Sequence, residues 1–179
     1  MIVTAGFPAV PTRALIVGLG TSGRAALELL RALEVEVAGY DQRPDDSLGL
    51  TIHTEFDGAC FDGVDLVVLS PGVDPRPVRA AAQALGRGEV RFVGEMGLAL
   101  EVGPQIWGRL PLALITGTNG KSTVTAMVGH VLDKVALRPF CGGNLGEPLS
   151  ARLAAVMRGE AEAPGSLVLE CSSFQLETM

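Results

Sequence analysis

The chain has 179 residues and a formal net charge of −6, and this length is enough to bury the core of one ordinary domain or two small ones. Apolar residues make up 47% of the sequence and charged residues 19%, a composition typical of a folded protein that excludes intrinsic disorder. The acidic balance argues against nucleic acid as the main partner, because binding to nucleic-acid phosphates depends on a basic surface.

Apolar runs in the sequence are short. The run Leu66-Val67-Val68-Leu69 is among the longest, so no segment is predicted to span a bilayer, and no basic region followed by an apolar stretch marks a signal peptide. The 3 cysteines are widely separated and form no C-x-x-C pair, which favours reduced thiols over a disulfide framework or a zinc site. We therefore expect a soluble cytoplasmic protein without a membrane partner.

In the first half of the chain, short aliphatic runs alternate with helix-like stretches, the pattern of a parallel α/β fold. Strands are predicted over 14–17, 35–40, 66–69 and 91–93, and helices over 21–33, 78–85 and 96–102. Gly103-Pro104 is expected to end the last of these helices, with Gly108 and Pro111 on either side of a junction. The pattern predicts a Rossmann-like domain over residues 1–104.

The second half repeats the alternation. Strands are predicted over 112–115, 139–141 and 166–169, and helices over 121–135 and 148–157. A last helix would begin after the third strand and be cut within its first turns. Because parallel sheets average about five or six strands, three strands indicate an incomplete sheet. The predicted fold class is thus α/β: a Rossmann-like parallel-sheet domain, then an incomplete P-loop α/β domain over residues 105–179.

The strongest motif is Thr116-Gly117-Thr118-Asn119-Gly120-Lys121-Ser122-Thr123, between a predicted strand and a predicted helix. Glycines allow successive backbone N–H groups to face a phosphate, and the helix N-terminus adds partial positive charge. Lys121 can reach the β- and γ-phosphates, and the Ser122 hydroxyl can bind Mg²⁺. The general P-loop spacing would place glycine at position 115, where this chain has Ile115, so the loop is a shortened variant. We predict that Gly117–Thr123 bind a nucleoside triphosphate; the alternative is an incidental glycine-rich helix entry.

A second motif, Gly18-Leu19-Gly20-Thr21-Ser22-Gly23, follows the first predicted strand and fits G-x-G-x-x-G. Asp41 ends the next strand, where a dinucleotide fold places its ribose-binding acid. Taken alone, this pattern suggests NAD or FAD. The same turn holds any diphosphate, however, so the motif specifies a pyrophosphate more than a nicotinamide. Arg43 could contact a phosphate or could be a solvated loop residue.

A third motif is the segment Leu169-Glu170-Cys171-Ser172-Ser173-Phe174-Gln175-Leu176-Glu177. A carboxylate at the end of a buried strand beside a P-loop is suited to hold Mg²⁺, which predicts that role for Glu170. Ser172, Ser173 and Gln175 would offer polar groups at the carboxyl edge of the sheet, where open α/β folds bind ligands. The alternative for Glu170 is a helix-capping or solvated carboxylate.

Two further features stay open from the sequence. The stretch Gly142-Gly143-Asn144-Leu145-Gly146 could let backbone approach a ligand or could be a tight turn. Glu95 could belong to a site or could only be an acid at a helix start.

Together these motifs resemble the Mur ligase family of bacterial cell-wall synthesis, and within it the branch that adds D-glutamate. The resemblance runs over essentially the whole chain, because Gly18–Gly23, Ser70-Pro71-Gly72, Gly117–Thr123, Gly143–Gly146 and Leu169–Glu177 occur in the family's order and approximate spacing. The last segment is the most discriminating, since that branch typically reads Leu-Ser-Ser-Phe-Gln-Leu-Glu. Here Cys171 replaces the usual leucine.

The resemblance implies an ATP-dependent peptide synthase that joins D-glutamate to UDP-N-acetylmuramoyl-L-alanine through an acyl phosphate, for peptidoglycan precursors. It implies ATP and Mg²⁺ as cofactors, with Lys121 and Glu170 catalytic and Ser122 and Glu170 holding the metal. The implied UDP-substrate residues are Gly18, Leu19, Gly20, Thr21, Ser22, Gly23, Asp41, Arg43, Ser70, Pro71 and Gly72, with Asn144, Ser172 and Gln175 orienting the muramoyl-alanine part. No obligate protein partner is implied.

Parts of the family's active site have no counterpart here. The carbamylated lysine, the metal-binding histidine and most D-glutamate contacts lie downstream in the family, so we expect this chain alone to form no amide bond. The alternatives are another Mur ligase branch, an NAD-dependent oxidoreductase, a P-loop ATPase or kinase, and a truncated product that depends on a partner to fold.

Overall fold

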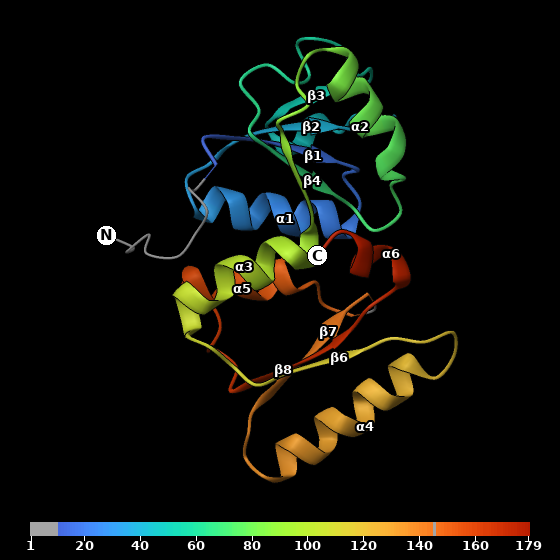
Figure 1. Ribbon diagram of the computed structural model, residues 1–179. Coiled ribbons are helices and arrows are strands. Elements are labelled where there is room, and N and C mark those ends of the chain that lie inside the picture. Colours follow the sequence, from blue (N-terminus) through green and yellow to red (C-terminus); the bar gives the residue numbers. More distant parts are fainter. Residues whose placement is uncertain (1–10, 145) are drawn as a thin grey trace.

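The computed structural model describes residues 11–144 and 146–179, so residues 1–10 of the first predicted domain and Leu145 of the glycine-rich stretch lie outside it. Two parallel sheets are separated by a layer of helices (Figure 1). The elements in chain order are β1 Arg13–Val17, α1 Thr21–Ala32, β2 Glu36–Tyr40, a 3₁₀ turn Asp46–Leu48, β3 Thr51–His53, β4 Leu66–Leu69, α2 Pro75–Ala84, β5 Arg91–Gly94, α3 Glu95–Trp107, β6 Leu112–Ile115, α4 Lys121–Lys134, β7 Pro139–Gly143, α5 Leu149–Met157, β8 Ser166–Glu170 and α6 Ser173–Glu177.

The first sheet has the strand order β3-β2-β1-β4-β5, with every pairing parallel. This is the order of one Rossmann half followed by the start of the next, with its switch point between β1 and β4. Alternate residues of β1 and β4 face opposite sides and are buried on both. Leu15 and Val67 pack with Val78 of α2, and Ile16 and Val68 pack under α1 and α3. Burial on both faces explains the uninterrupted apolar runs.

The second sheet has the order β6-β8-β7 and is also parallel. Among the described residues it holds three strands, as predicted. α4 covers one of its faces, and α5 and α3 lie on the other (Figure 1). Apolar side chains remain exposed on the outer strand β6 and along α4, namely Leu112, Leu114, Val124, Met127, Val131 and Val135. The α/β fold class predicted from the sequence is confirmed.

Three elements differ from the sequence prediction. Strand β3 was not predicted; it has three residues and pairs only with β2. Helix α2 begins at Pro75 rather than at residue 78, because the Asp74 side chain accepts a hydrogen bond from the Arg76 N–H and caps it.

Helix α3 does not end at Gly103-Pro104, as was predicted, but continues to Trp107. A Cβ at Gly103 would lie 2.8 Å from Nε1 of Trp107, so this glycine lets the indole fold back onto its own helix. Packing of the indole compensates for the hydrogen bond lost at Pro104, and the chain leaves the helix at Gly108, where φ is +77°. The predicted division into domains at 104/105 thus falls inside α3. That division stays a prediction.

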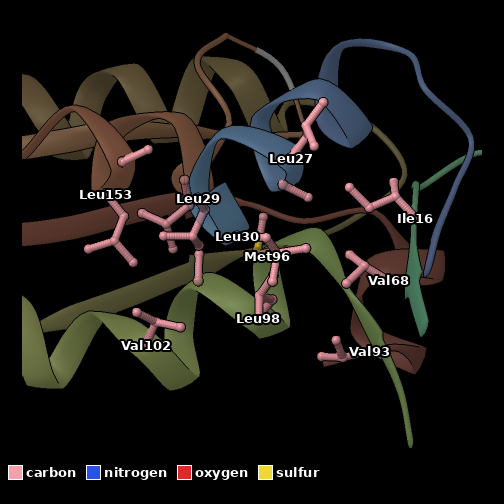
Figure 2. Packing of buried hydrophobic residues seen from close by; sticks show 14 of the residues in the cluster. Ile16, Leu27, Leu29, Leu30, Val68, Val93, Met96, Leu98, Val102 and Leu153 are labelled. Carbon is pink, nitrogen blue, oxygen red and sulfur yellow. The ribbon is translucent and has the colours of Figure 1, made fainter. Parts of the chain in front are cut away.

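One apolar cluster joins the two sheets. It holds Leu29 and Leu30 of α1, Met96 and Val102 of α3, and Leu153 of α5, together with strand residues from both sheets (Figure 2). α5 packs against both α1 and α3. The two sheets therefore share one buried layer, and the turns at their edges are held by the same packing.

We expect Leu153→Ala to lower the free energy of unfolding by about 2–4 kcal/mol, because it opens a cavity in this shared layer. Leu153 is 0% exposed, whereas Val131 on α4 is 61% exposed. Val131→Ala is the matched control and should change stability by no more than about 0.5 kcal/mol. Urea unfolding followed by circular dichroism measures both, and equal effects would show that the layer does not hold the two sheets together.

Candidate functional site

The turn between β1 and α1 is built for close backbone approach. Gly18 has φ +89°, and its N–H donates to the Tyr40 carbonyl at 2.9 Å. A Cβ on Gly23 would lie 1.9 Å from the Gly18 carbonyl oxygen, so α1 packs directly on the turn. Gly20 is the N-cap of α1 and provides no side-chain cap. The first turn of α1 holds the predicted residues Thr21, Ser22 and Gly23. Because no side chain caps this helix, their backbone N–H groups favour binding of an anion.

Asp41 braces this turn. Its Oδ2 accepts from the Leu19 N–H at 2.8 Å and its Oδ1 from the Arg43 N–H at 2.9 Å. The backbone hydrogen bond from Arg43, followed by that from Leu19, lowers the pKa of Asp41 below its ordinary value. The sequence predicted that Asp41 contacts a ligand; in the structure its carboxylate ties the glycine turn to the loop that carries Arg43.

Ser70 braces the same turn from the other side. Its hydroxyl donates to the Gly18 carbonyl at 2.7 Å, and its own carbonyl accepts from the Val73 N–H at 2.9 Å. Pro71 and Gly72 are the central residues of the turn that this second hydrogen bond closes. The predicted residues of the first sheet therefore lie together at its carboxyl edge, around the switch point between β1 and β4.

Two cavities open at this edge. One of about 390 Å³ is lined by Gly18, Asp41 and Arg43 and by the stacked rings of Tyr40 and Phe56, whose centroids are 3.8 Å apart. This aromatic pair was not predicted from the sequence, because Phe56 follows the unpredicted strand β3. The other cavity, of about 570 Å³, lies between the Pro71–Arg76 segment and residues Phe174 and Glu177 at α6.

The loop between β6 and α4 holds the predicted ATP-binding residues. Gly117 has φ +145°, and Gly120, at φ +78°, is the N-cap of α4 without a side-chain cap. Lys121 folds back so that its Nζ donates to the Gly117 carbonyl at 2.7 Å. Thr118 and Asn119 are exposed, as are Ser122 and Thr123 in the first turn of α4. The loop and the first turn of α4 thus present backbone N–H groups, the Lys121 ammonium and the hydroxyls of Thr118, Ser122 and Thr123.

Glu170 ends β8, the central strand of the second sheet, and is 2% exposed. It pairs with Ile115, the last residue of β6, after which the loop to α4 begins. Asn144 lies beside it, donating its backbone N–H to the Glu170 carbonyl at 2.8 Å and its Nδ2 to Oε1 at 3.2 Å. The fold brings together Glu170 and Asn144, which the sequence predicted on separate grounds, next to the loop.

Ser172 and Gln175 are engaged with each other. They form a capping box at the start of α6: the Ser172 hydroxyl accepts from the Gln175 N–H at 3.2 Å, and the Gln175 Oε1 accepts from the Ser172 N–H at 2.9 Å. Gln175 is 4% exposed. The two side chains predicted to orient a substrate therefore fix the direction of α6.

The residues predicted to hold a metal carry oxygen donors, the kind that Mg²⁺ prefers. No cluster of three or more His, Cys, Asp or Glu residues within 11–144 and 146–179 could hold a metal by itself. The predicted donors are one carboxylate, Glu170, and one hydroxyl, Ser122. Mg²⁺ is commonly held in this way, with nucleotide phosphates and water completing its coordination.

No membrane-spanning helix occurs in the part of the chain that the structure describes.

The chain matches proteins named UDP-N-acetylmuramoylalanine–D-glutamate ligase. It is 43% identical over 177 residues to the one from Myxococcus xanthus, covering 92% of this chain and 36% of that protein. It is 42% identical over 176 residues to the one from Anaeromyxobacter dehalogenans, covering 93% of this chain and 36% of that protein. The chain therefore spans a little over a third of the length of these relatives. No protein-family model matches it.

A solved structure shares the fold. It is the UDP-N-acetylmuramate:L-alanyl-γ-D-glutamyl-meso-diaminopimelate ligase from Neisseria meningitides, with a TM-score of 0.50 and 20% identity over 91% of this chain and 55% of that one. The resemblance predicted from the motifs is confirmed by the sequence relatives: over the part that it spans, the chain belongs to the Mur ligase family.

Proposed function

We propose that the protein is an ATP-dependent ligase that joins D-glutamate to UDP-N-acetylmuramoyl-L-alanine in cytoplasmic peptidoglycan precursor synthesis. The observation that carries the proposal is the pair of glycine turns, Gly18–Gly23 and Gly117–Gly120, each leading into a helix without a side-chain cap. They lie at the carboxyl edges of two sheets that share one core. Two such turns suit two phosphate-bearing ligands, a UDP-sugar and ATP. The names of the relatives supply the substrates.

The first sheet would hold the UDP part. Thr21, Ser22 and Gly23 would offer N–H groups to the diphosphate, and Arg43 and the Tyr40–Phe56 pair line the cavity beside the turn. A stacked aromatic pair is a favourable surface for a flat base. The muramoyl-alanine part would then extend past Pro71 and Gly72 towards Asn144 and α6.

The second sheet would hold ATP and direct the chemistry. Lys121 would exchange the Gly117 carbonyl for the β- and γ-phosphates, and Ser122 and Glu170 would hold Mg²⁺, which supplies positive charge against the phosphates. The alanyl carboxylate would take the γ-phosphoryl group, leaving ADP and an acyl phosphate. The amine of D-glutamate would attack that carbonyl, lose a proton and expel phosphate, forming the amide. Positioning of the two substrates contributes the remaining acceleration.

The first test is calorimetric titration of the chain with UDP-N-acetylmuramoyl-L-alanine, with NADH as the comparison ligand. We expect saturable binding of the UDP-sugar and none of NADH. Binding is measured rather than turnover, because the chain spans only 36% of the Myxococcus xanthus ligase. NADH binding without UDP-sugar binding would support the oxidoreductase alternative and overturn the ligase proposal.

The proposed role of Lys121 is tested by Lys121→Ala. We expect the affinity of this variant for Mg²⁺–ATP to be at least about tenfold lower than that of the wild type, because a charge-assisted contact to phosphate is lost. UDP-sugar affinity should not change, since Lys121 lies at the second sheet. Lys134, at the opposite end of the same helix, gives the matched control Lys134→Ala. Equal ATP affinities in the two variants would remove Lys121 from the site.

The bracing role of Asp41 is tested by Asp41→Asn. An amide oxygen cannot replace both carboxylate acceptors, so we expect weaker UDP-sugar binding and a loss of about 1 kcal/mol of stability at neutral pH, a modest figure because solvent screens the group. The pKa of folded Asp41 is lowered, so its stabilisation is full above the unfolded pKa of about 3.9 and is lost as the pH falls through the folded pKa.

The stability gap between wild type and Asp41→Asn should therefore close in acid, as measured by urea unfolding from pH 7 downward. Asp133, exposed on α4, gives the control Asp133→Asn. A gap that stays constant with pH, or that the control reproduces, would contradict the bracing role.

A further inference from the structure

Glu95 is a buried carboxylate that the proposed chemistry does not use. It is the first residue of α3, directly after β5 of the first sheet, and it is 2% exposed. The sequence left open whether it is more than an acid at a helix start. Its surroundings connect it to the other sheet.

Glu95 accepts two hydrogen bonds from Ser150 of α5. Its Oε1 accepts from the Ser150 N–H at 2.8 Å, and its backbone carbonyl accepts from the Ser150 hydroxyl at 3.2 Å. α3 and α5 pack side by side between the sheets (Figure 1). Both bonds lie in the buried layer, where a hydrogen bond is costly to lose.

The carboxylate of Glu95 caps α5 from outside that helix. The N-cap residue of α5 is Pro148, which offers no side-chain acceptor to the N–H groups of the first turn. Glu95 supplies one through its Oε1. Burial raises the pKa of Glu95, whereas the bonds from Ser150 act to lower it, and in the described part of the chain Oε2 has no hydrogen-bond partner.

The helix capped in this way follows the loop that carries Asn144. At the start of that loop the Gly143 N–H donates to the Glu147 carbonyl at 3.1 Å, and Asn144 bonds to Glu170 through its backbone and its side chain. Met96, next to Glu95, packs where a Cβ on Gly143 would lie 2.9 Å from its Cε. Two consecutive residues of α3 thus contact the elements on either side of the loop: Glu95 contacts the first turn of α5, and Met96 lies against the end of β7.

We propose that Glu95 is a positioning residue: by capping α5 it fixes the loop of Asn144, and through Asn144 the carboxylate of Glu170, relative to the first sheet. The inference rests on the proposed function and deepens it. It names the residue that holds Glu170, the acid proposed to bind Mg²⁺, in place relative to the sheet proposed to bind the UDP-sugar. Its geometry does not depend on any ligand.

The test is amide hydrogen exchange by NMR on the whole chain without ligand. In Glu95→Ala, the Ser150 and Asn144 amides should exchange about tenfold faster, since the cap and the loop it holds are lost, while the Leu19 amide keeps its wild-type rate. Glu95→Gln keeps an acceptor oxygen for the Ser150 N–H and should restore both rates. Glu101→Ala, farther along α3 and facing Arg91, is the matched control and should leave both amides unchanged.

Wild-type rates at Ser150 and Asn144 in Glu95→Ala would overturn the proposal. So would faster exchange that extends equally to Leu19, or a Glu95→Gln variant as fast as the alanine variant. If Glu95→Ala does not fold, Glu95→Asp serves in its place, because the shorter side chain withdraws the acceptor while keeping the acid. The exchange experiment uses no nucleotide or sugar, so a failed ligand titration would reject the proposed function and leave this inference standing.

Discussion

The buried helix layer between the two sheets is the constraint on which the rest of the structure depends. α5 packs against α1 and α3, and its Leu153 belongs to the same apolar cluster as Leu30 and Met96. Apolar burial on this scale is the main favourable term in folding. Because the layer is shared, neither sheet can move without disturbing the packing under the other. The separation of the two glycine turns is therefore set by side-chain packing as well as by the connecting chain.

Within that frame, the groups proposed to bind phosphates are backbone N–H groups at the carboxyl edges of parallel strands. A glycine at a positive φ precedes each uncapped helix, Gly18 before α1 and Gly120 before α4. N–H groups held in this way need no rearrangement to meet a phosphate. Lys121, the first residue of α4, donates a hydrogen bond from its ammonium to the Gly117 carbonyl. This carbonyl is a neutral acceptor that a phosphate can replace at small cost.

Several polar side chains at these edges stabilise the turns rather than remaining free for a ligand. Asp41 and Ser70 brace the Gly18 turn from two sides, and Ser172 with Gln175 fixes the start of α6. A buried or half-buried polar group is stable only when it is hydrogen-bonded, so each of these residues takes the nearest backbone partner. Some members of a motif predicted to bind a ligand can therefore act through the backbone that they hold.

The sequence by itself determined the alternation of strands and helices, the two glycine turns before α1 and α4, and the family, because apolar periodicity and glycine spacing are local properties. It missed β3, which is too short to show a period, and it ended α3 at Pro104, where packing of Trp107 on Gly103 outweighs the missing N–H. Only the tertiary structure decided that Glu170 lies beside Asn144, that Tyr40 stacks on Phe56 and that Glu95 caps α5. Each of these contacts joins residues far apart in the chain, and their meeting depends on strand order and helix packing, which no local pattern encodes.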